Sequence, residues 1–219
     1  MRYAILDTGR SRSFPGKHAL RSGAAKKMQD ADVVVVIGAN VRKRAASLSR
    51  WKNKTAVLLE LGSECLGVYT GESRGEEGSN VLGFARFRLG SSEPTDLVEL
   101  VRQPRTGQAA LAAAQEIFAA AGLQVAVCGD FAGRIIDRLV RPYYNAALQQ
   151  LDAGLASADD LDTTLRLGLG YPEGPIQLLE RTGLAHHFDA TQALFEAYGD
   201  AAYAPARRAC VAKQRKQKD

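Results

Sequence analysis

The most regular part of the chain runs from Gly133 to Pro175, where apolar residues recur at helical spacing. The first apolar stripe contains Ile135, Ile136, Leu139, Val140, Tyr143, Ala147 and Leu151. This period predicts one long helix with an apolar face, which Gly154 ends as a left-handed cap. Pro142 removes one backbone donor inside that helix, so we expect a bend near Arg138.

Two more helices follow after short connections. Ser157 and Asp160 form a capping box at the start of the next helix. That helix carries the apolar positions Leu161, Leu165 and Leu169. Gly174-Pro175 then opens a third helix, with proline at the first helical position, where its missing N–H has no cost. Helices joined so closely predict an antiparallel bundle.

The first half of the chain is patterned as strands. Val33–Ile37 and Thr55–Leu61 are continuous apolar runs, typical of strands buried on both faces of a parallel sheet. Further strands are predicted at Tyr3–Leu6, Val81–Phe87, Leu97–Arg102 and Leu123–Val127. Between them we predict one amphipathic helix over Val41–Trp51, a loop over Gly71–Asn80, and an alanine-rich helix capped by Thr106. The expected fold is an α/β parallel-sheet domain at residues 1–129 followed by an all-α domain at residues 130–219.

The composition narrows the class of protein. The chain of 219 residues has a net charge of +5, and no apolar run near its start is long enough for a signal or a membrane span. Cys65, Cys128 and Cys210 lie far apart, which argues against a metal site or a disulfide framework and fits a reducing compartment. We therefore expect a soluble, cytoplasmic protein without a membrane partner.

Basic residues gather between Arg42 and Lys54. They form either a solvated helix face or a surface for nucleic acid or CoA phosphates. A nucleic-acid-binding module would be expected to alternate basic with aromatic residues, and this stretch does not. We therefore expect no nucleic-acid partner.

The first predicted strand ends in Asp7-Thr8-Gly9-Arg10-Ser11-Arg12. A dinucleotide-binding turn at this place needs three glycines, because the backbone must approach the pyrophosphate closely. Only Gly9 is present, and two arginines crowd the turn. Asp30 and Asp32 lie far enough downstream to mimic the ribose-binding acid, but Asp32 precedes a strand instead of ending one. We therefore assign no cofactor-binding residue.

The order and spacing of glycine, proline and other marked positions in the second half resemble those of the C-terminal helical domain of the 3-hydroxyacyl-CoA dehydrogenase family. The matching positions are Gly133, Ile135-Ile136, Asp137-Arg138, Pro142-Tyr143, Asn145, Ala147 and Gly168–Pro175. The resemblance implies that the preceding domain is a reduced Rossmann-like domain, and it implies NAD as the family's cofactor. In this family the helical domain supplies dimer contacts and part of the acyl-CoA cleft.

The resemblance also implies where an active site would lie. The family's general-base histidine falls on Ala85, and the glutamate that orients it falls on Glu99, a catalytic remnant. The serine and the asparagine that bind the substrate oxygen fall on Ser63 and Asp137, although an ungapped match places Glu64 on the serine. Oxidation of a secondary alcohol needs a base whose pKa lies near neutrality, and Ala85 cannot supply one.

The chain's three histidines do not replace that base. His18 lies in a polar segment, and His186 and His187 are neighbours on a predicted helix, where they point about 100° apart and cannot face one metal ion. We expect both to be surface residues, and we expect no metal site.

The preferred interpretation is a degenerate member of this family that acts through a homodimer of the helical domain and through acyl-CoA binding. The alternative is an active or partner-completed NAD-dependent 3-hydroxyacyl-CoA (3-hydroxybutyryl-CoA) dehydrogenase of fatty-acid or aromatic-acid breakdown. Fold-level resemblance cannot separate the two, because function lies in the site.

Overall fold

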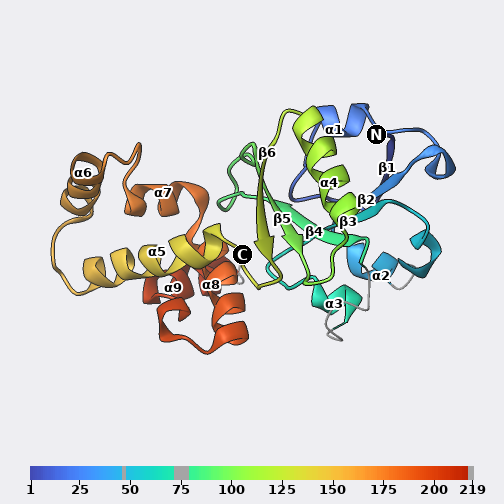
Figure 1. The fold of residues 1–219 in the computed structure, drawn as a ribbon. Coiled ribbons are helices and arrows are strands. Elements are labelled where there is room, and N and C mark those ends of the chain that lie inside the picture. The colour runs from blue at the N-terminus through green and yellow to red at the C-terminus, as the bar shows by residue number, and fades with distance from the viewer. Residues whose placement is uncertain (46–47, 72–78, 217–219) are drawn as a thin grey trace. The chain divides into compact units, whose positions relative to one another are not determined.

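The computed structural model describes residues 1–45, 48–71 and 79–216, which fall into two compact units (Figure 1). The first unit contains residues 1–88 and 94–134, and the second contains residues 89–93 and 135–219. The division at Arg134 lies shortly after the predicted boundary at residue 129. Most of the predicted loop at Gly71–Asn80 lies outside the described residues.

The first unit is built on a six-stranded sheet whose spatial order follows the chain. Its strands are β1 (Tyr3–Asp7), β2 (Val33–Ile37), β3 (Ala56–Glu60), β4 (Val81–Arg86), β5 (Leu97–Arg102) and β6 (Gln124–Gly129). All neighbouring pairs are parallel except β4 and β5, which are antiparallel. The six predicted strands are confirmed, and the α/β class with them.

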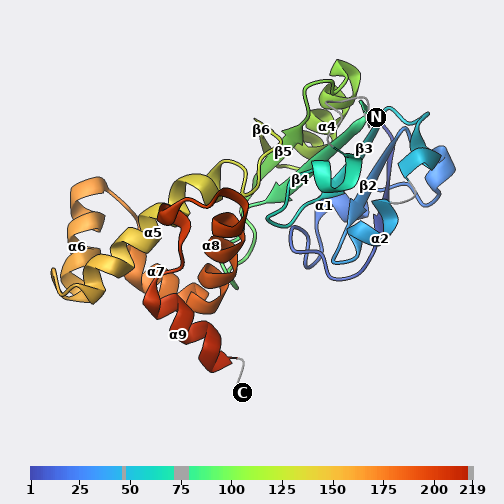
Figure 2. The same ribbon diagram turned by 90° about the horizontal axis from the view of Figure 1, so that it is seen from below.

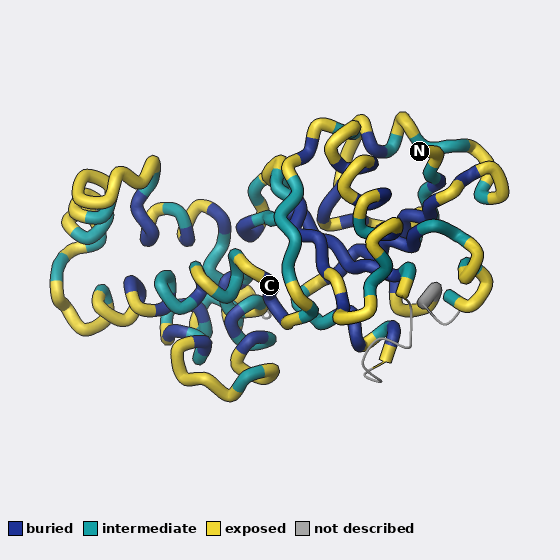
Figure 3. Tube along the Cα trace, viewed as in Figure 1, coloured by how far each residue is buried: buried dark blue, intermediate teal, exposed yellow. Residues whose placement is uncertain are grey.

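The sheet is buried on both faces, as the unbroken apolar runs of β2 and β3 predicted. Alternate residues of each strand point to opposite faces. Val33, Val35 and Ile37 belong to one apolar core, whereas Val34 and Val36 belong to the other. Figure 3 shows the central strands as a continuous buried layer.

Two groups of helices cover the two faces of the sheet. α1 (Ala19–Ser22) and α4 (Gln108–Ala120) contribute side chains to the first core. α2 (Val41–Ala45), the 3-10 helix η2 (Leu48–Trp51) and α3 (Gly67–Thr70) contribute to the second. A further 3-10 helix, η1, spans Met28–Asp30.

One helix prediction in this unit is tested only in part and another was wrong. Of the predicted helix at Val41–Trp51 the structure describes α2 and the 3-10 helix η2, and residues 46–47 lie outside the described residues. Lys54, just after them, donates to the carbonyls of Met28 and Ala31, so its ammonium ties this connection to the segment before β2. Thr106 does not cap α4, whose cap residue is Gly107; the Thr106 hydroxyl instead accepts from the Gln103 N–H at 2.9 Å.

The strand order has a consequence for ligand binding. In a dinucleotide-binding sheet the strands run 3-2-1-4-5-6, and the ligand lies at the carboxyl ends where that order reverses. Here the order runs from β1 to β6 without a reversal. The described sheet therefore lacks the switch point at which such folds hold their cofactor.

The second unit is helical. It contains α5 (Ile136–Asp152), α6 (Ala158–Leu169), α7 (Pro175–Thr182), α8 (Leu184–Tyr198), the 3-10 helix η3 (Ala201–Tyr203) and α9 (Arg207–Lys216). The core of this unit lies between α5, α7 and the segment before α9, with Leu148, Ile176, Leu179 and Ala206 at its centre. Segment 89–93 joins the same unit, since the Ser91 N–H donates to the Thr182 carbonyl at the end of α7.

The predicted helix starts and the predicted glycine cap in this unit are confirmed. Ser157 caps α6 by accepting from the Asp160 N–H, and Gly174-Pro175 opens α7. Gly154 has φ of 74° just after α5. Pro142 lies inside α5, and the carbonyl of Arg138, four residues before it, accepts the Tyr203 hydroxyl at 3.3 Å.

Two properties of the helices bear on partners. Along the part of the chain that the structure describes, none of the helices combines the length and the apolar character needed to cross a bilayer. α6 has no buried residue, and Figures 1 and 2 show it at one end of the helical unit beside α5 and α7.

Candidate functional site

The antiparallel pair β4 and β5 sets the geometry of the first candidate site. Ala85 and Glu99 are directly opposite partners in that pair. Opposite residues of an antiparallel ladder project their side chains from the same face, about 5 Å apart at Cβ. A histidine at position 85 would therefore stand beside the Glu99 carboxylate, and the alanine leaves that place without a base.

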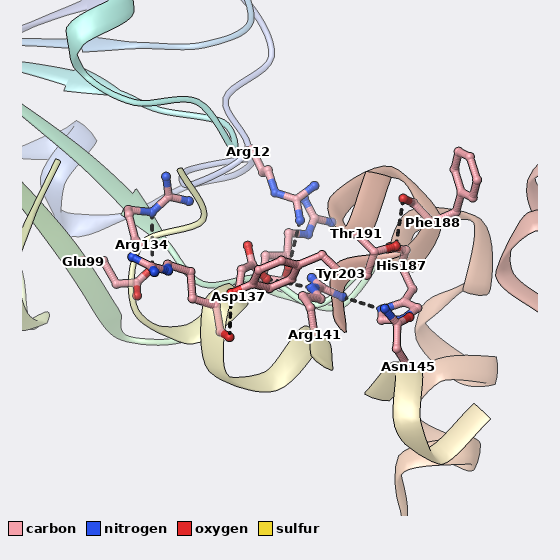
Figure 4. A network of polar contacts seen from close by, with 12 residues as sticks. Arg12, Glu99, Arg134, Asp137, Arg141, Asn145, His187, Phe188, Thr191 and Tyr203 are labelled. Carbon is pink, nitrogen blue, oxygen red and sulfur yellow. Dashed lines mark hydrogen bonds and ion pairs between the residues drawn. The ribbon is translucent and has the colours of Figure 1, made fainter. Parts of the chain in front are cut away.

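Glu99 is not a free carboxylate. It is 2% exposed, and its Oε2 lies 3.3 Å from Nε of Arg134, which is 8% exposed (Figure 4). The Arg86 guanidinium donates to the carbonyls of Ser13, Pro94 and Thr95, which closes the turn between β4 and β5.

Arg134 reaches Glu99 from an uncommon backbone conformation. Its φ is 51°. Among the residues that the structure describes, it is the non-glycine residue with a positive φ. Its Nη1 is buried and has no hydrogen-bond partner among the described atoms. The Glu99 carboxylate is therefore in a buried ion pair with the Arg134 guanidinium.

Ser63 lies in the loop after β3, and that loop is anchored to the segment after β6. The Ser63 carbonyl accepts from the Gly133 N–H at 2.9 Å. Asp130 accepts from the N–H groups of Leu66 and Gly67 at 2.6 and 2.8 Å, at the start of α3. These hydrogen bonds therefore hold the loop both at Ser63 and at the start of α3. The Ser63 side chain is partly exposed.

The loop after β1 is closed by a carboxylate from β3. Glu60, 6% exposed, accepts from the Ser11 hydroxyl at 3.0 Å, from the Ser13 N–H at 2.6 Å and from the Gly38 N–H at 2.6 Å. These donors come from the loops that follow β1 and β2. Backbone N–H groups in such loops are what a pyrophosphate requires. Here an internal anion already takes them.

The backbones of the same two loops also touch. A Cβ on Gly38 would lie 2.6 Å from the Gly9 carbonyl oxygen, so the loops leave no room between them. The next helix, α1, has four residues and begins at Ala19, well beyond the turn. A dinucleotide needs a glycine-rich turn that leads directly into a helix. The residues after β1 therefore do not fit NAD.

The second candidate site lies in the helical unit, where Asp137 begins a buried polar network (Figure 4). Asp137 accepts from Arg141 Nε at 2.8 Å, and Arg141, 2% exposed, contacts Nδ1 of His187 at 3.2 Å. His187 Nε2 lies 2.9 Å from Asn145 Oδ1. The Asn145 amide donates to the carbonyls of Ala202 and Ala204. The network joins α5, α8 and η3.

This network assigns the protonation of His187. A guanidinium can only donate, so Nδ1 of His187 accepts, and Nε2–H donates to Asn145. Burial, and after it the charge of Arg141, lower the pKa of His187 from 6.5 to about 3. The expectation that His187 is a surface residue was wrong, since it is 1% exposed. It is a neutral structural histidine.

Asp137 belongs to the helical unit, whereas Ser63 and Glu99 belong to the sheet unit. Its carboxylate is neutralised by Arg141 within its own helix. Sequence reasoning missed Arg134, Arg141 and Glu60, although each is a charged residue inside or next to an apolar run, a pattern that signals a buried pair.

His18 is a helix cap, because its Nδ1 accepts from the Leu20 N–H and its ring packs edge-on against Phe14. Burial raises the pKa of the Cys128 thiol to about 11, which disfavours the thiolate. Across residues 1–45, 48–71 and 79–216, no three His, Cys, Asp or Glu side chains gather closely enough to hold a metal ion.

Comparisons with known proteins point to one family. Residues 133–219 match the family described as 3-hydroxyacyl-CoA dehydrogenase, C-terminal domain. A 3-hydroxybutyryl-CoA dehydrogenase of Bradyrhizobium diazoefficiens is 36% identical over 110 residues, which cover 50% of this chain and 38% of that protein. The mitochondrial hydroxyacyl-coenzyme A dehydrogenase of Homo sapiens is 39% identical over 88 residues, 40% of this chain and 28% of that protein. The matched region thus spans well under half of these relatives' length.

Solved structures extend the likeness to the sheet unit. M. tuberculosis FadB2 matches with a TM-score of 0.72 and 25% identity, over 86% of this chain and 67% of that one. The (S)-3-hydroxybutyryl-CoA dehydrogenase PaaH1 of Ralstonia eutropha has the same fold, with a TM-score of 0.69 and 23% identity over 83% and 65% of the two chains. Residues 133–219 therefore match the C-terminal domain of the 3-hydroxyacyl-CoA dehydrogenase family, and the sheet unit before them has the Rossmann-like fold of these solved dehydrogenases.

Proposed function

We propose that the chain is a non-catalytic or partner-dependent member of its family, which acts through a homodimer of the helical unit and by binding an acyl-CoA. The observation that carries this proposal is the pair Ala85 and Glu99: the glutamate is present, but its opposite residue has no titratable group. A missing base lowers the rate by about 10² to 10⁴. In the loop after β1, Glu60 accepts backbone N–H groups that a dinucleotide would need. This supports the proposal that the chain by itself does not transfer a hydride.

The homodimer is proposed from α6 and the turns that flank it. Leu155, Leu167, Leu169 and Tyr171 are 68%, 75%, 59% and 42% exposed. None of the residues of α6 is buried, and large apolar side chains left exposed on a helix are what an interaction surface presents. Ile176 and Leu179 of α7 are buried inside the helical unit and do not contribute to such a surface. The second copy is expected on α6.

The alternative is an active or partner-completed NAD-dependent 3-hydroxyacyl-CoA (3-hydroxybutyryl-CoA) dehydrogenase of fatty-acid or aromatic-acid breakdown. It is favoured by the retention of Glu99, and by relatives at 36–39% identity whose names are those of dehydrogenases. A partner that completed the site would have to bring both a base and a seat for the nicotinamide.

Titration of the purified chain with NADH and with acetoacetyl-CoA, alone and together, separates these two functions. The proposal expects acetoacetyl-CoA binding, no NADH binding tighter than about 1 mM, and no oxidation of 3-hydroxybutyryl-CoA. Micromolar NADH binding together with turnover by the chain alone would refute it. Sedimentation measures dimerisation independently. The proposed homodimer can therefore be tested even if the chain binds no ligand.

A further inference from the structure

A cavity of the sheet unit lies outside the carboxyl ends of β2 and β3. Its volume is about 320 Å³, and it is bordered by the loops after β1, β2 and β3 and by α2 and α3. These two helices are neighbours on the same side of the sheet (Figure 1). The carboxyl ends of parallel strands are where α/β sheets bind their ligands. Every residue that borders this cavity belongs to the sheet unit, so the cavity is a property of that unit alone.

Part of the border is acidic. Glu60 is 6% exposed, and the hydroxyl and the two N–H groups that it binds are neutral. Glu64 accepts from the Tyr69 hydroxyl at 2.6 Å. A Cβ on Gly62 would lie 2.6 Å from Oε2 of Glu64, so the glycine leaves the room that this carboxylate occupies. Neutral donors orient a carboxylate but do not remove its negative charge, so both charges remain at the cavity.

Tyr69 stays protonated and therefore remains the donor to Glu64. Burial, and after it the hydrogen bond to Glu64, raise the pKa of Tyr69. The positive charge of Arg42 lowers the same pKa, with a smaller effect. Because an effect of this kind weakens with distance, the Arg42 guanidinium lies near the hydrogen-bonded pair of Tyr69 and Glu64.

Another part of the border is basic. Arg10, from the loop after β1, and Arg42, from α2, border the cavity and are exposed. Among the residues that the structure describes, neither of these two arginines forms a hydrogen bond or an ion pair, and Glu64 has no basic partner. Charges of both signs thus border one cavity without neutralising each other.

A ligand with charges of both signs can pair with both parts of the border. An ammonium group donates to carboxylates, and an anionic oxygen group matches the paired N–H groups of a guanidinium. A purely anionic ligand would instead meet the like charges of Glu60 and Glu64. We propose that the cavity binds a small amphoteric molecule, with an ammonium group beside Glu64 and a carboxylate or phosphate beside Arg10 and Arg42.

This inference goes beyond the proposed function. The volume of about 320 Å³ is near the lower end of the range for small-molecule pockets, which suits a molecule of amino-acid size. CoA esters and NADH carry phosphate charges without an ammonium group, so the cavity is expected to select against both. The inference therefore depends neither on acyl-CoA binding nor on dimerisation.

The test is calorimetric titration of the full chain at neutral pH and low ionic strength. The ligands are 4-aminobutyrate, butyrate and butylamine, together with glycine and 6-aminohexanoate, which place the two charges at other spacings. At neutral pH the amino acids carry both charges, whereas butyrate and butylamine carry one each. We expect at least one amino acid to bind about tenfold more tightly than either single-charge compound. This advantage should shrink as salt is added.

Two variants separate the two ends of the ligand. Glu64→Gln keeps an oxygen that can accept from Tyr69 but removes the negative charge. It should weaken binding of the amino acid and of butylamine about tenfold, and leave butyrate within about twofold. Arg42→Gln should weaken the amino acid and butyrate about tenfold and leave butylamine within about twofold. Neither side chain is buried, so both variants should keep the wild-type melting temperature, which verifies folding.

Glu116→Gln and Arg50→Gln are the matched controls, because they alter exposed side chains of the same unit that do not border the cavity. Both should bind every ligand within about twofold of wild type. O-phosphoethanolamine identifies the anionic group: tighter binding than that of the best amino acid assigns a phosphate, and weaker binding assigns a carboxylate. Amino acids that bind no more tightly than the single-charge compounds, or equal losses in the cavity variants and the controls, would overturn the proposal.

Discussion

Ala85 and Glu99 face each other across β4 and β5, so the strand register places an alanine where a carboxylate-oriented base would stand. The relationship fixes the alignment of these two strands, since a slip by one residue would turn either side chain to the other face of the sheet. The Glu99 carboxylate forms an ion pair with Arg134 inside the sheet unit.

Restoring the base should not restore the reaction. In Ala85→His an imidazole would stand beside Glu99, but the loop after β1 still has no room for a pyrophosphate. We expect no NAD-dependent oxidation of 3-hydroxybutyryl-CoA, followed by NADH absorbance, with Ala85→Gln as the matched variant. Turnover in the histidine variant alone would mean that the cofactor has a seat that the loop geometry conceals.

Glu99→Gln should lower stability and leave any weak activity unchanged. Removing one partner of a buried ion pair typically costs about 3–5 kcal/mol, because the remaining charge is left unpaired. Glu99→Leu combined with Arg134→Leu should cost less than the sum of the two single changes. Urea unfolding measures each variant, and Glu116→Gln, which alters an exposed carboxylate, should move the midpoint little. Additive effects of the two leucine substitutions would contradict a direct pair.

Glu60→Gln should destabilise the sheet unit by about 1–3 kcal/mol, because the amide cannot accept all the hydrogen bonds that the carboxylate receives. The loops after β1 and β2 should open together, since both are tied to this side chain. Hydrogen exchange of the Ser13 and Gly38 amides measures that opening directly. Unchanged protection of both amides would show that Glu60 does not hold the loops.

Acid should unfold the helical unit through His187. Its pKa is about 3 in the folded chain and 6.5 when unperturbed, so the unfolded state binds the proton first. The stability is complete above pH 6.5 and falls below it, by up to about 1.4 kcal/mol for each pH unit. His187→Gln should remove this slope between about pH 6 and 4, as measured by urea unfolding followed through the helical signal. An equal slope in both proteins would assign the acid sensitivity to other groups.

The proposed dimer should depend on α6. Leu167→Asp combined with Leu169→Asp places two charges on an apolar surface, and sedimentation at micromolar concentration should then show a monomer with intact helix content. Val68→Asp is the control, because Val68 is 55% exposed but lies in the other unit. A wild-type chain that is already monomeric would remove the proposal, as would a double variant that remains dimeric.

Local signals along the chain predicted the local structure. The apolar runs located the strands, and the caps at Ser157 and Gly174 located two helix starts, because these features depend on a few adjacent residues and their backbone. Local signals did not always suffice. Thr106 looked like a helix cap but bonds to Gln103, and of the helix expected at Val41–Trp51 the structure describes an α-helical piece, Val41–Ala45, and a 3-10 piece, Leu48–Trp51.

The sequence by itself determined the two-part architecture, the family of the C-terminal domain, and the absence of both a glycine-rich turn and a histidine at position 85. Only the tertiary structure decided which charges are paired. Glu99 with Arg134, Asp137 with Arg141 and His187, and Glu60 with the loops after β1 and β2 join residues from separate elements. The physical reason is that a buried charge must find a partner wherever the fold provides one, and that choice has no periodicity along the chain.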